Sequence, residues 1–84
     1  MFITVKPSIF IDALQLELYS RTGNFLRGVL RDDSGSICST LEKNIQSEKE
    51  QITWTGLSEL PYGKYTIELS QGDDEVKMNL VKRI

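Results

Sequence analysis

Residues 52 to 84 read ITWTGLSELPYGKYTIELSQGDDEVKMNLVKRI, and this stretch decides the fold class. Apolar and polar residues alternate on both sides of a turn formed by Gly72, Asp73 and Asp74. A period of two residues is typical of strands with one buried and one exposed face. On the two strands beside this turn, the residues expected to point inward are Tyr65, Ile67, Leu69, Val76, Met78 and Leu80.

Short alternating segments continue through the rest of the chain. The expected strands are residues 2–5, 13–19, 25–31, 37–41, 51–55, 64–70 and 75–82. Turn residues separate them at a spacing of about 8–12 residues, and no helical pattern suited to a βαβ unit lies between them. The sequence therefore predicts an all-β fold, an antiparallel β-sandwich of about seven strands.

Further expectations concern particular positions within and between these strands. On the second expected strand Leu14, Leu16 and Leu18 point inward, as do Ile52 and Trp54 on the fifth. On the fourth, the alternation predicts one face shared by Ile37, Ser39 and Leu41. Gly28 is expected to mark a β-bulge. The polar residues 42–50 are expected to form the longest loop, with a short helix as the alternative.

The composition limits the classes of function. The 84 residues suit one domain, 1–84, with little room for an enclosed active site. A net charge of −2 gives no reason to expect nucleic acid as a partner. No apolar run approaches the roughly 20 residues of a transmembrane segment. There is no histidine, and the single cysteine, Cys38, excludes an internal disulfide and a zinc–cysteine cluster.

Two acidic turns are the candidates for a metal site. Asp32 and Asp33 precede Ser34-Gly35, and Asp73 and Asp74 follow Gly72. Carboxylates in such turns can bind calcium, but neither turn has the ligand spacing of a known calcium loop. Because Asp and Gly are also the residues that tight turns use, we expect turns without a metal or cofactor.

Enzyme activity is not expected. The serines have no histidine partner, and Glu17 and Glu68 alternate with apolar residues, as solvent-facing strand residues do. Cys38 is expected to be a small half-buried residue and not a reactive thiol.

The aromatic residues offer a different candidate, a platform for binding sugars. Its members would be Tyr19, Trp54, Tyr62 and Tyr65. The alternation instead predicts that Trp54 and Tyr65 belong to the core, and that Tyr62 is exposed in a turn.

Several motifs resemble those of the type A C-terminal sorting domain of the type IX secretion system, found at the end of exported proteins in Bacteroidota. Residues 5–10 and 16–23 occupy the places of the opening element and of its following glycine turn. Residues 60–65 match the Leu-Pro-x-Gly-x-Tyr signature, and residues 79–83 are close to the basic terminal strand. The resemblance covers nearly the whole chain in the same order.

The resemblance implies an immunoglobulin-like sandwich that acts as a folded address on a cargo protein. Its partners would be the outer-membrane secretion translocon and a sortase-like signal peptidase, and it would pass through the periplasm to the cell surface or the medium. The residues expected to carry recognition are Lys77, Asn79, Leu80, Val81, Lys82 and Arg83. We expect Lys77, Asn79 and Lys82 to point outward, and with Arg83 to give the last strand a basic outer face.

Two alternatives remain open at this stage. The chain could be a non-catalytic binding or spacer module, of the carbohydrate-binding or adhesin type, from a multidomain surface protein. A dimer formed through an edge strand is also compatible with an open sandwich.

Overall fold

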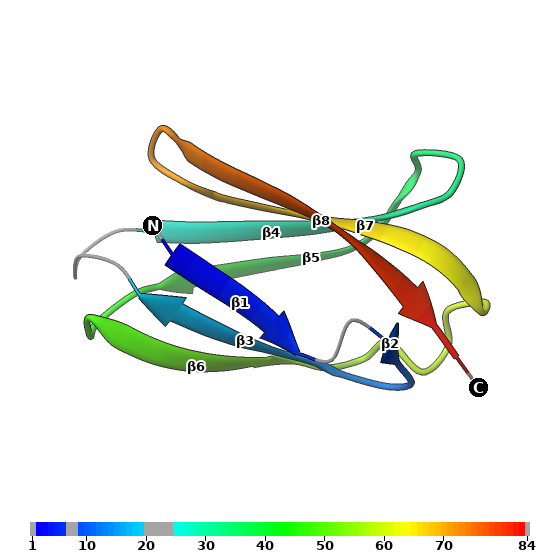
Figure 1. Cartoon of the computed structure of the whole chain (residues 1–84). Helices are drawn as coiled ribbons and strands as arrows, with labels where there is room; N and C mark the ends of the chain where they lie inside the picture. Colours follow the sequence, from blue (N-terminus) through cyan, green and yellow to red (C-terminus); the bar gives the residue numbers. More distant parts are fainter. Residues whose placement is uncertain (1, 7–8, 20–24, 84) are drawn as a thin grey trace.

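The computed structural model of the chain describes residues 2–6, 9–19 and 25–83, which form two β-sheets stacked face to face (Figure 1). No helix occurs among these residues, so the expectation of an all-β fold is confirmed. The strands are β1 (Phe2–Lys6), β2 (Ile9–Phe10), β3 (Leu14–Tyr19), β4 (Phe25–Asp32), β5 (Ile37–Asn44), β6 (Lys49–Trp54), β7 (Gly63–Gln71) and β8 (Asp74–Lys82).

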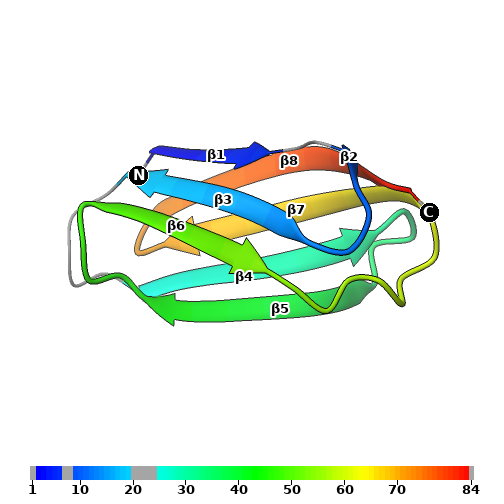
Figure 2. The ribbon, with the colours of Figure 1, turned by 90° about the horizontal axis from the view of Figure 1, so that it is seen from below.

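One sheet has the strand order β1-β3-β6, and the other has the order β2-β8-β7-β4-β5. The chain passes repeatedly from one sheet to the other, and Figure 2, seen from the side of the three-stranded sheet, shows β3 and β6 in front of β7 and β4. Neighbouring strands are antiparallel except β2 and β8, which run parallel with Ile9 beside Val81 and Phe10 beside Lys82. The prediction of a purely antiparallel sandwich is therefore wrong at β2. Two residues are too few for an alternating pattern to reveal a strand.

A single apolar core lies between the sheets. The predicted inward residues of β3, β6 and β7 are all buried, and Leu80 of β8 is 3% exposed. Val76 and Met78 are half-buried and pack against the same cluster. Ile45 and Leu57, from connecting segments, are fully covered as well. Removal of this apolar surface from water is the main force that holds the two sheets together.

Trp54 on β6 bridges the two sheets. Its ring lies against Gly28 on β4, where an added Cβ atom would sit 2.9 Å from Cζ3 of the indole. The indole Nε1 donates a hydrogen bond of 3.0 Å to the Ser39 hydroxyl on β5. Gly28 is thus required for close approach and not for a bulge. The Gly28 bulge prediction is wrong, because the β4–β5 register is continuous across this residue.

The irregularity of this sheet lies at Cys38. Leu30 pairs with Ser39 but Arg31 pairs with Ile37, so Cys38 is the extra residue of a β-bulge. The bulge reverses the alternation, and Ile37 points outward with 56% of its surface exposed. The predicted shared face of Ile37, Ser39 and Leu41 is therefore wrong at Ile37. Cys38 is half-buried, as the sequence predicts.

The polar segment 42–50 is mostly strand, which corrects the prediction of a long loop or a short helix. β5 runs through Asn44 and β6 begins at Lys49, so the connection is residues 45–48. Lys43 Nζ lies 3.2 Å from Glu50 Oε2 and closes this connection. Pairing with β4 and β3 overrides the weak β-propensity of Glu, Lys and Asn.

Two turns position β7. Gly72, with φ of 59°, opens the two-residue β7–β8 loop in the manner of a type II′ turn. At the other end of β7, the Tyr65 hydroxyl donates a hydrogen bond of 2.6 Å to the carbonyl of Pro61. The Tyr65 ring is buried and meets the ring of Phe10 edge-on, with 6.0 Å between the ring centroids. This hydrogen bond therefore closes the turn formed by residues 60–65.

The packing of Trp54 on Gly28 predicts a steric cost for Gly28→Ala. We expect the free energy of unfolding to fall by about 1–3 kcal/mol, the usual effect of overpacking. In a Trp54→Phe background the smaller ring should leave room for the methyl group and reduce that cost. Urea unfolding of the four proteins, followed by circular dichroism, gives the coupling directly. Equal costs in the two backgrounds would show that the ring and the glycine are not in contact.

The Tyr65–Pro61 hydrogen bond predicts that Tyr65→Phe destabilises the fold by about 1 kcal/mol, since only the donor is removed. Tyr62→Phe is a matched control, because Tyr62 is 70% exposed and three residues away. It should change stability by less than about 0.5 kcal/mol. Thermal and urea unfolding measure both changes, and indistinguishable variants would contradict a stabilising role for the hydrogen bond.

Candidate functional site

Most of the predicted recognition residues fall on or beside the outer face of the five-stranded sheet. We use "outer face" for the residues that alternate with core residues on its four long strands. They are Phe25, Arg27, Val29, Arg31, Ile37, Thr40, Glu42, Asn44, Lys64, Thr66, Glu68, Ser70, Glu75, Lys77, Asn79 and Val81. Side chains on one face of neighbouring strands lie close enough to interact.

The strand register arranges these side chains in rows across the sheet. Asn79 lies opposite Thr66, which lies opposite Arg31. Lys77 lies opposite Glu68 in the next row. This arrangement depends on pairing between distant segments, so the alternation of each strand alone does not reveal it.

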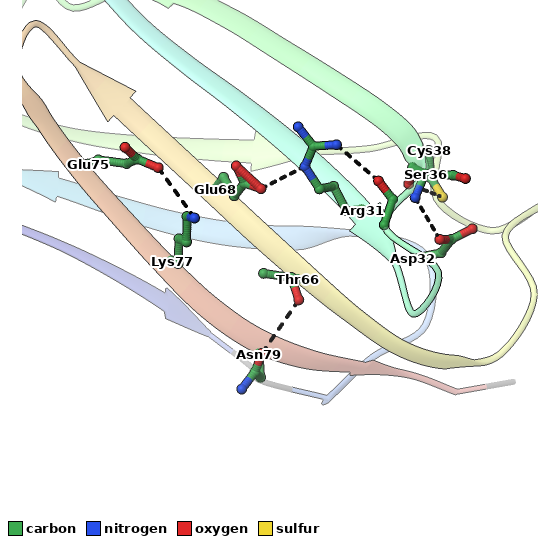
Figure 3. Close-up of polar contacts among 10 residues, drawn as sticks. Arg31, Asp32, Ser36, Cys38, Thr66, Glu68, Glu75, Lys77 and Asn79 are labelled. Atoms are coloured by element: carbon green, nitrogen blue, oxygen red, sulfur yellow. Dashed lines mark hydrogen bonds and ion pairs between the residues drawn. The ribbon is translucent and has the colours of Figure 1, made fainter.

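A polar network connects the rows, as Figure 3 shows. Arg31 Nε donates to Glu68 Oε2 at 2.7 Å, and its Nη1 donates to the Gly35 carbonyl at 3.0 Å. Thr66 Oγ1 lies 3.5 Å from Asn79 Oδ1. Arg31 thus ties β7 to the turn that follows β4. Neither Arg31 nor Thr66 is among the residues predicted to carry recognition, although the alternation of β7 correctly places Thr66 outward.

Four of the six predicted recognition residues are exposed. Lys77 and Asn79 point outward from β8, Val81 is 38% exposed beside Ile9, and Arg83 follows the strand. The structure therefore brings these four to one side of β8.

Leu80 and Lys82 are instead buried, each with 3% of its surface exposed. The prediction that Lys82 points outward is wrong, because the alternation that buries Leu80 continues to residue 82. Lys82 Nζ is within hydrogen-bonding distance of the Arg83 carbonyl, at 2.8 Å. A long side chain can bring its ammonium group to a polar atom while its stem stays covered.

The outer face is mixed in charge and not basic. On β8, Glu75 lies beside Lys77, with 3.8 Å between Oε1 and Nζ. Across the face four cations, Arg27, Arg31, Lys64 and Lys77, accompany three carboxylates, Glu42, Glu68 and Glu75. The expected basic strip on the last strand is therefore reduced to Lys77 and Arg83. Glu68, expected to face solvent, is half-buried in its pair with Arg31.

Asp32 organises the turn between β4 and β5. Its Oδ1 accepts hydrogen bonds from the Ser34 hydroxyl at 2.7 Å and from the backbone N–H groups of Ser34 and Ser36 at 3.0 Å. The Ser34 hydroxyl and then the Ser36 amide hold the pKa of the Asp32 carboxyl below its ordinary value of 3.8. The carboxylate thus acts as an acceptor within its own turn. The described residues hold no group of three or more acidic, cysteine or histidine side chains suited to a metal.

Two shallow hollows flank the start of β7. One, of about 370 Å³, is lined on its polar side by Asp33, Lys64, Thr66 and Asn79. The other, of about 390 Å³, lies on the side of Tyr62 and Cys38. Burial raises the pKa of the Cys38 thiol, so the sulfur is mainly protonated and a poor nucleophile at neutral pH.

The candidate sugar-binding aromatics do not gather in one place. Trp54 and Tyr65 are buried in the core, at 2% and 5% exposure. Tyr62 is exposed beside the second hollow, as predicted. Tyr19 lies on β3 in the opposite sheet, with Lys49 Nζ 5.6 Å from its ring centroid. Tyr19 therefore lies on the three-stranded sheet and Tyr62 in the turn before β7, and the two do not make one platform.

No protein-family model matches this chain, and no curated protein matches it. The part of the chain that the structure describes has no helix long and apolar enough to span a membrane.

The hydrogen bonds to Asp32 predict a pH-dependent stability. Because the folded state lowers this pKa, the ionised carboxylate stabilises the fold above about pH 4, and that contribution is lost as the pH falls through the folded-state pKa. Asp32→Asn should therefore be less stable than the wild type at about pH 6, with a difference that shrinks toward about pH 2.5. Urea unfolding across this range tests the expectation.

Ser34→Ala is the companion variant, because it removes the donor that contributes most to lowering this pKa. This variant should reduce the change of the unfolding free energy with pH over the same range, although the carboxylate is still present. A constant offset between wild type and Asp32→Asn at every pH would contradict the assignment.

Proposed function

We propose that this chain is a C-terminal sorting domain of the type IX secretion type, which directs an attached cargo through the outer membrane. The observation that carries the proposal is the conformation of residues 60–65. The Leu-Pro-x-Gly-x-Tyr signature forms a closed corner, in which the Tyr65 hydroxyl bonds back to Pro61 at 2.6 Å. The motif on which the resemblance rests is thus a structural unit at the entry to β7.

The strand order supports the immunoglobulin-like architecture that this function implies. Immunoglobulin-type sandwiches place strands A, B and E in one sheet and C, F and G in the other. The order β1-β3-β6 follows A-B-E, and β8-β7-β4-β5 follows G-F-C with an added C′ strand. In such folds a tyrosine near the start of strand F bonds to backbone a few residues upstream, which is the position of Tyr65 in β7.

The recognition surface in this proposal is the exposed side of β8. Lys77, Asn79, Val81 and Arg83 present charged, amide and apolar groups along one strand that the core holds in place. The partners would be the outer-membrane translocon and a sortase-like peptidase, both proteins. A rigid strand suits such partners, because it offers backbone hydrogen bonds together with alternate side chains. Cargo would cross the periplasm and reach the surface or the medium, and the domain itself would catalyse nothing.

An export assay tests this proposal. Residues 1–84 would be fused to a reporter directed to the periplasm of a type IX-competent bacterium. We expect the reporter on the surface or in the medium, and retention in the periplasm of a strain without the translocon. Retention of the intact fusion in the competent strain would overturn the proposal.

Substitutions then locate the address. Truncation from Leu80 is unsuitable, because Leu80 and Lys82 are buried and the fold would be lost. Joint replacement of Lys77, Asn79 and Arg83 by Ala should instead lower export several-fold with the fold intact by circular dichroism. The matched control replaces the exposed residues Gln51 and Thr53 of β6, and should leave export unchanged. Equal export of the two variants would show that these residues on and beside β8 do not carry the recognition signal.

A further inference from the structure

One edge of β8 is open along most of its length. β7 pairs with the whole strand, from Asp74 to Lys82. On the other side β2 covers only Val81 and Lys82. Among the described residues, no strand pairs with residues 75–80 on this side, and Figure 2 shows β8 as the outermost long strand of its sheet beyond β7. An unpaired strand edge is a template for another strand.

The direction of the backbone groups along this edge follows from one hydrogen bond. The Arg83 amide donates to the Phe10 carbonyl of β2 at 2.7 Å, so residue 83 directs its N–H toward the open side. The register with β7 is continuous through β8, and successive residues of a strand direct their backbone groups to alternate sides. Glu75, Lys77 and Asn79 therefore present their N–H and C=O groups at the open edge.

The side chains of these edge-facing residues are complementary to themselves. Glu75 and Lys77 are two residues apart on the outer face and carry opposite charges. We propose that a second copy of this chain binds this edge, with β8 antiparallel to β8 about a twofold axis and Val76 opposite the partner's Val76. Each Glu75 then lies opposite the partner's Lys77, and the two five-stranded sheets become continuous.

The neighbouring registers are less favourable. Moving the axis by one residue places Lys77 opposite the partner's Lys77 in one direction, and Glu75 opposite the partner's Glu75 in the other. Like charges directly opposite each other destabilise a strand pair, whereas opposite charges stabilise it. Moving the axis to Met78 brings Glu75 opposite the partner's Val81, where β2 already occupies the edge. Of these registers, only the one centred on Val76 places each Glu75 opposite the partner's Lys77 along an edge that no other strand occupies.

The same register is also favourable for the backbone hydrogen bonds and for the side chains of β8 that face the core. Glu75 and Lys77 both direct backbone groups outward, so each such pair would exchange two hydrogen bonds. Val76 and Met78 are half-buried at the margin of the core, and a partner strand would cover them further. β5, the edge strand at the opposite end of this sheet, carries the bulge at Cys38, and a bulge disrupts pairing.

The resulting dimer is expected to be weak. One short strand pair buries less than the roughly 800 Å² per partner of a standard interface. Its exposed ion pairs should make association weaker at high salt. The proposal does not depend on secretion, since it rests on the geometry of β8 alone.

Disulfide trapping tests the register. In a Cys38→Ser background, Val76→Cys should form a covalent dimer on mild oxidation, because the two sulfurs would face each other in a close pair. Met78→Cys is the matched control, because Met78 lies on the same face and is also half-buried. In the proposed register the two copies of residue 78 are offset by four residues, about 14 Å, beyond disulfide reach. Cross-linking through residue 78 in preference to residue 76 would overturn the register.

Charge reversal tests the recognition. Sedimentation of the 84-residue protein up to about 1 mM should show a concentration-dependent dimer. Glu75→Lys should weaken it at least about tenfold by placing lysines opposite each other, and the double variant Glu75→Lys/Lys77→Glu should restore it. A monomer at every concentration, or a dimer that ignores the single reversal, would overturn the proposal. A monomer that pairs with an unrelated strand peptide would assign the edge to a different protein.

Discussion

The contact on which the rest of the structure depends is that of the Trp54 ring with Gly28. The indole spans the space between the sheets, and it fits only because the residue opposite it lacks a side chain. Its hydrogen bond to Ser39 fixes the ring against β5 as well. One side chain from the three-stranded sheet thereby sets the position of two strands of the other sheet. The leucines and isoleucines around it fill the space that this contact defines.

The alternation within each strand predicted most of the core correctly, because a period of two depends only on local sequence. The alternation failed at positions where burial or strand length depends on how two strands pair. The bulge at Cys38 turned Ile37 outward, and β5 extended through charged residues that have low β-propensity when considered alone. β2 was missed since a parallel pair of two residues is held by its neighbours and not by a pattern of its own.

The candidate site was predicted in part for the same reason. Lys77 and Asn79 were placed outward by alternation, and the same rule applied consistently would have placed Lys82 inward. Charge favours exposure of a basic side chain, but the position of Lys82 in the strand buries it. The partners of the outward residues, such as Arg31 beside Glu68, come from segments far apart in the chain. Their association requires the register of the folded sheet.

The pairing of β2 with the end of β8 affects the order in which the molecule can form. β8 lies between β2 and β7 in its sheet, so segments from both ends of the sequence meet on it. During synthesis the residues that precede β8 emerge while the edges of β2 and β7 that pair with it are still unpaired. The sheet can close only when residues 74–83 have left the ribosome. A chain that lacks β8 therefore keeps an edge of β2 and an edge of β7 unpaired, and the pairing of β8 removes both open edges.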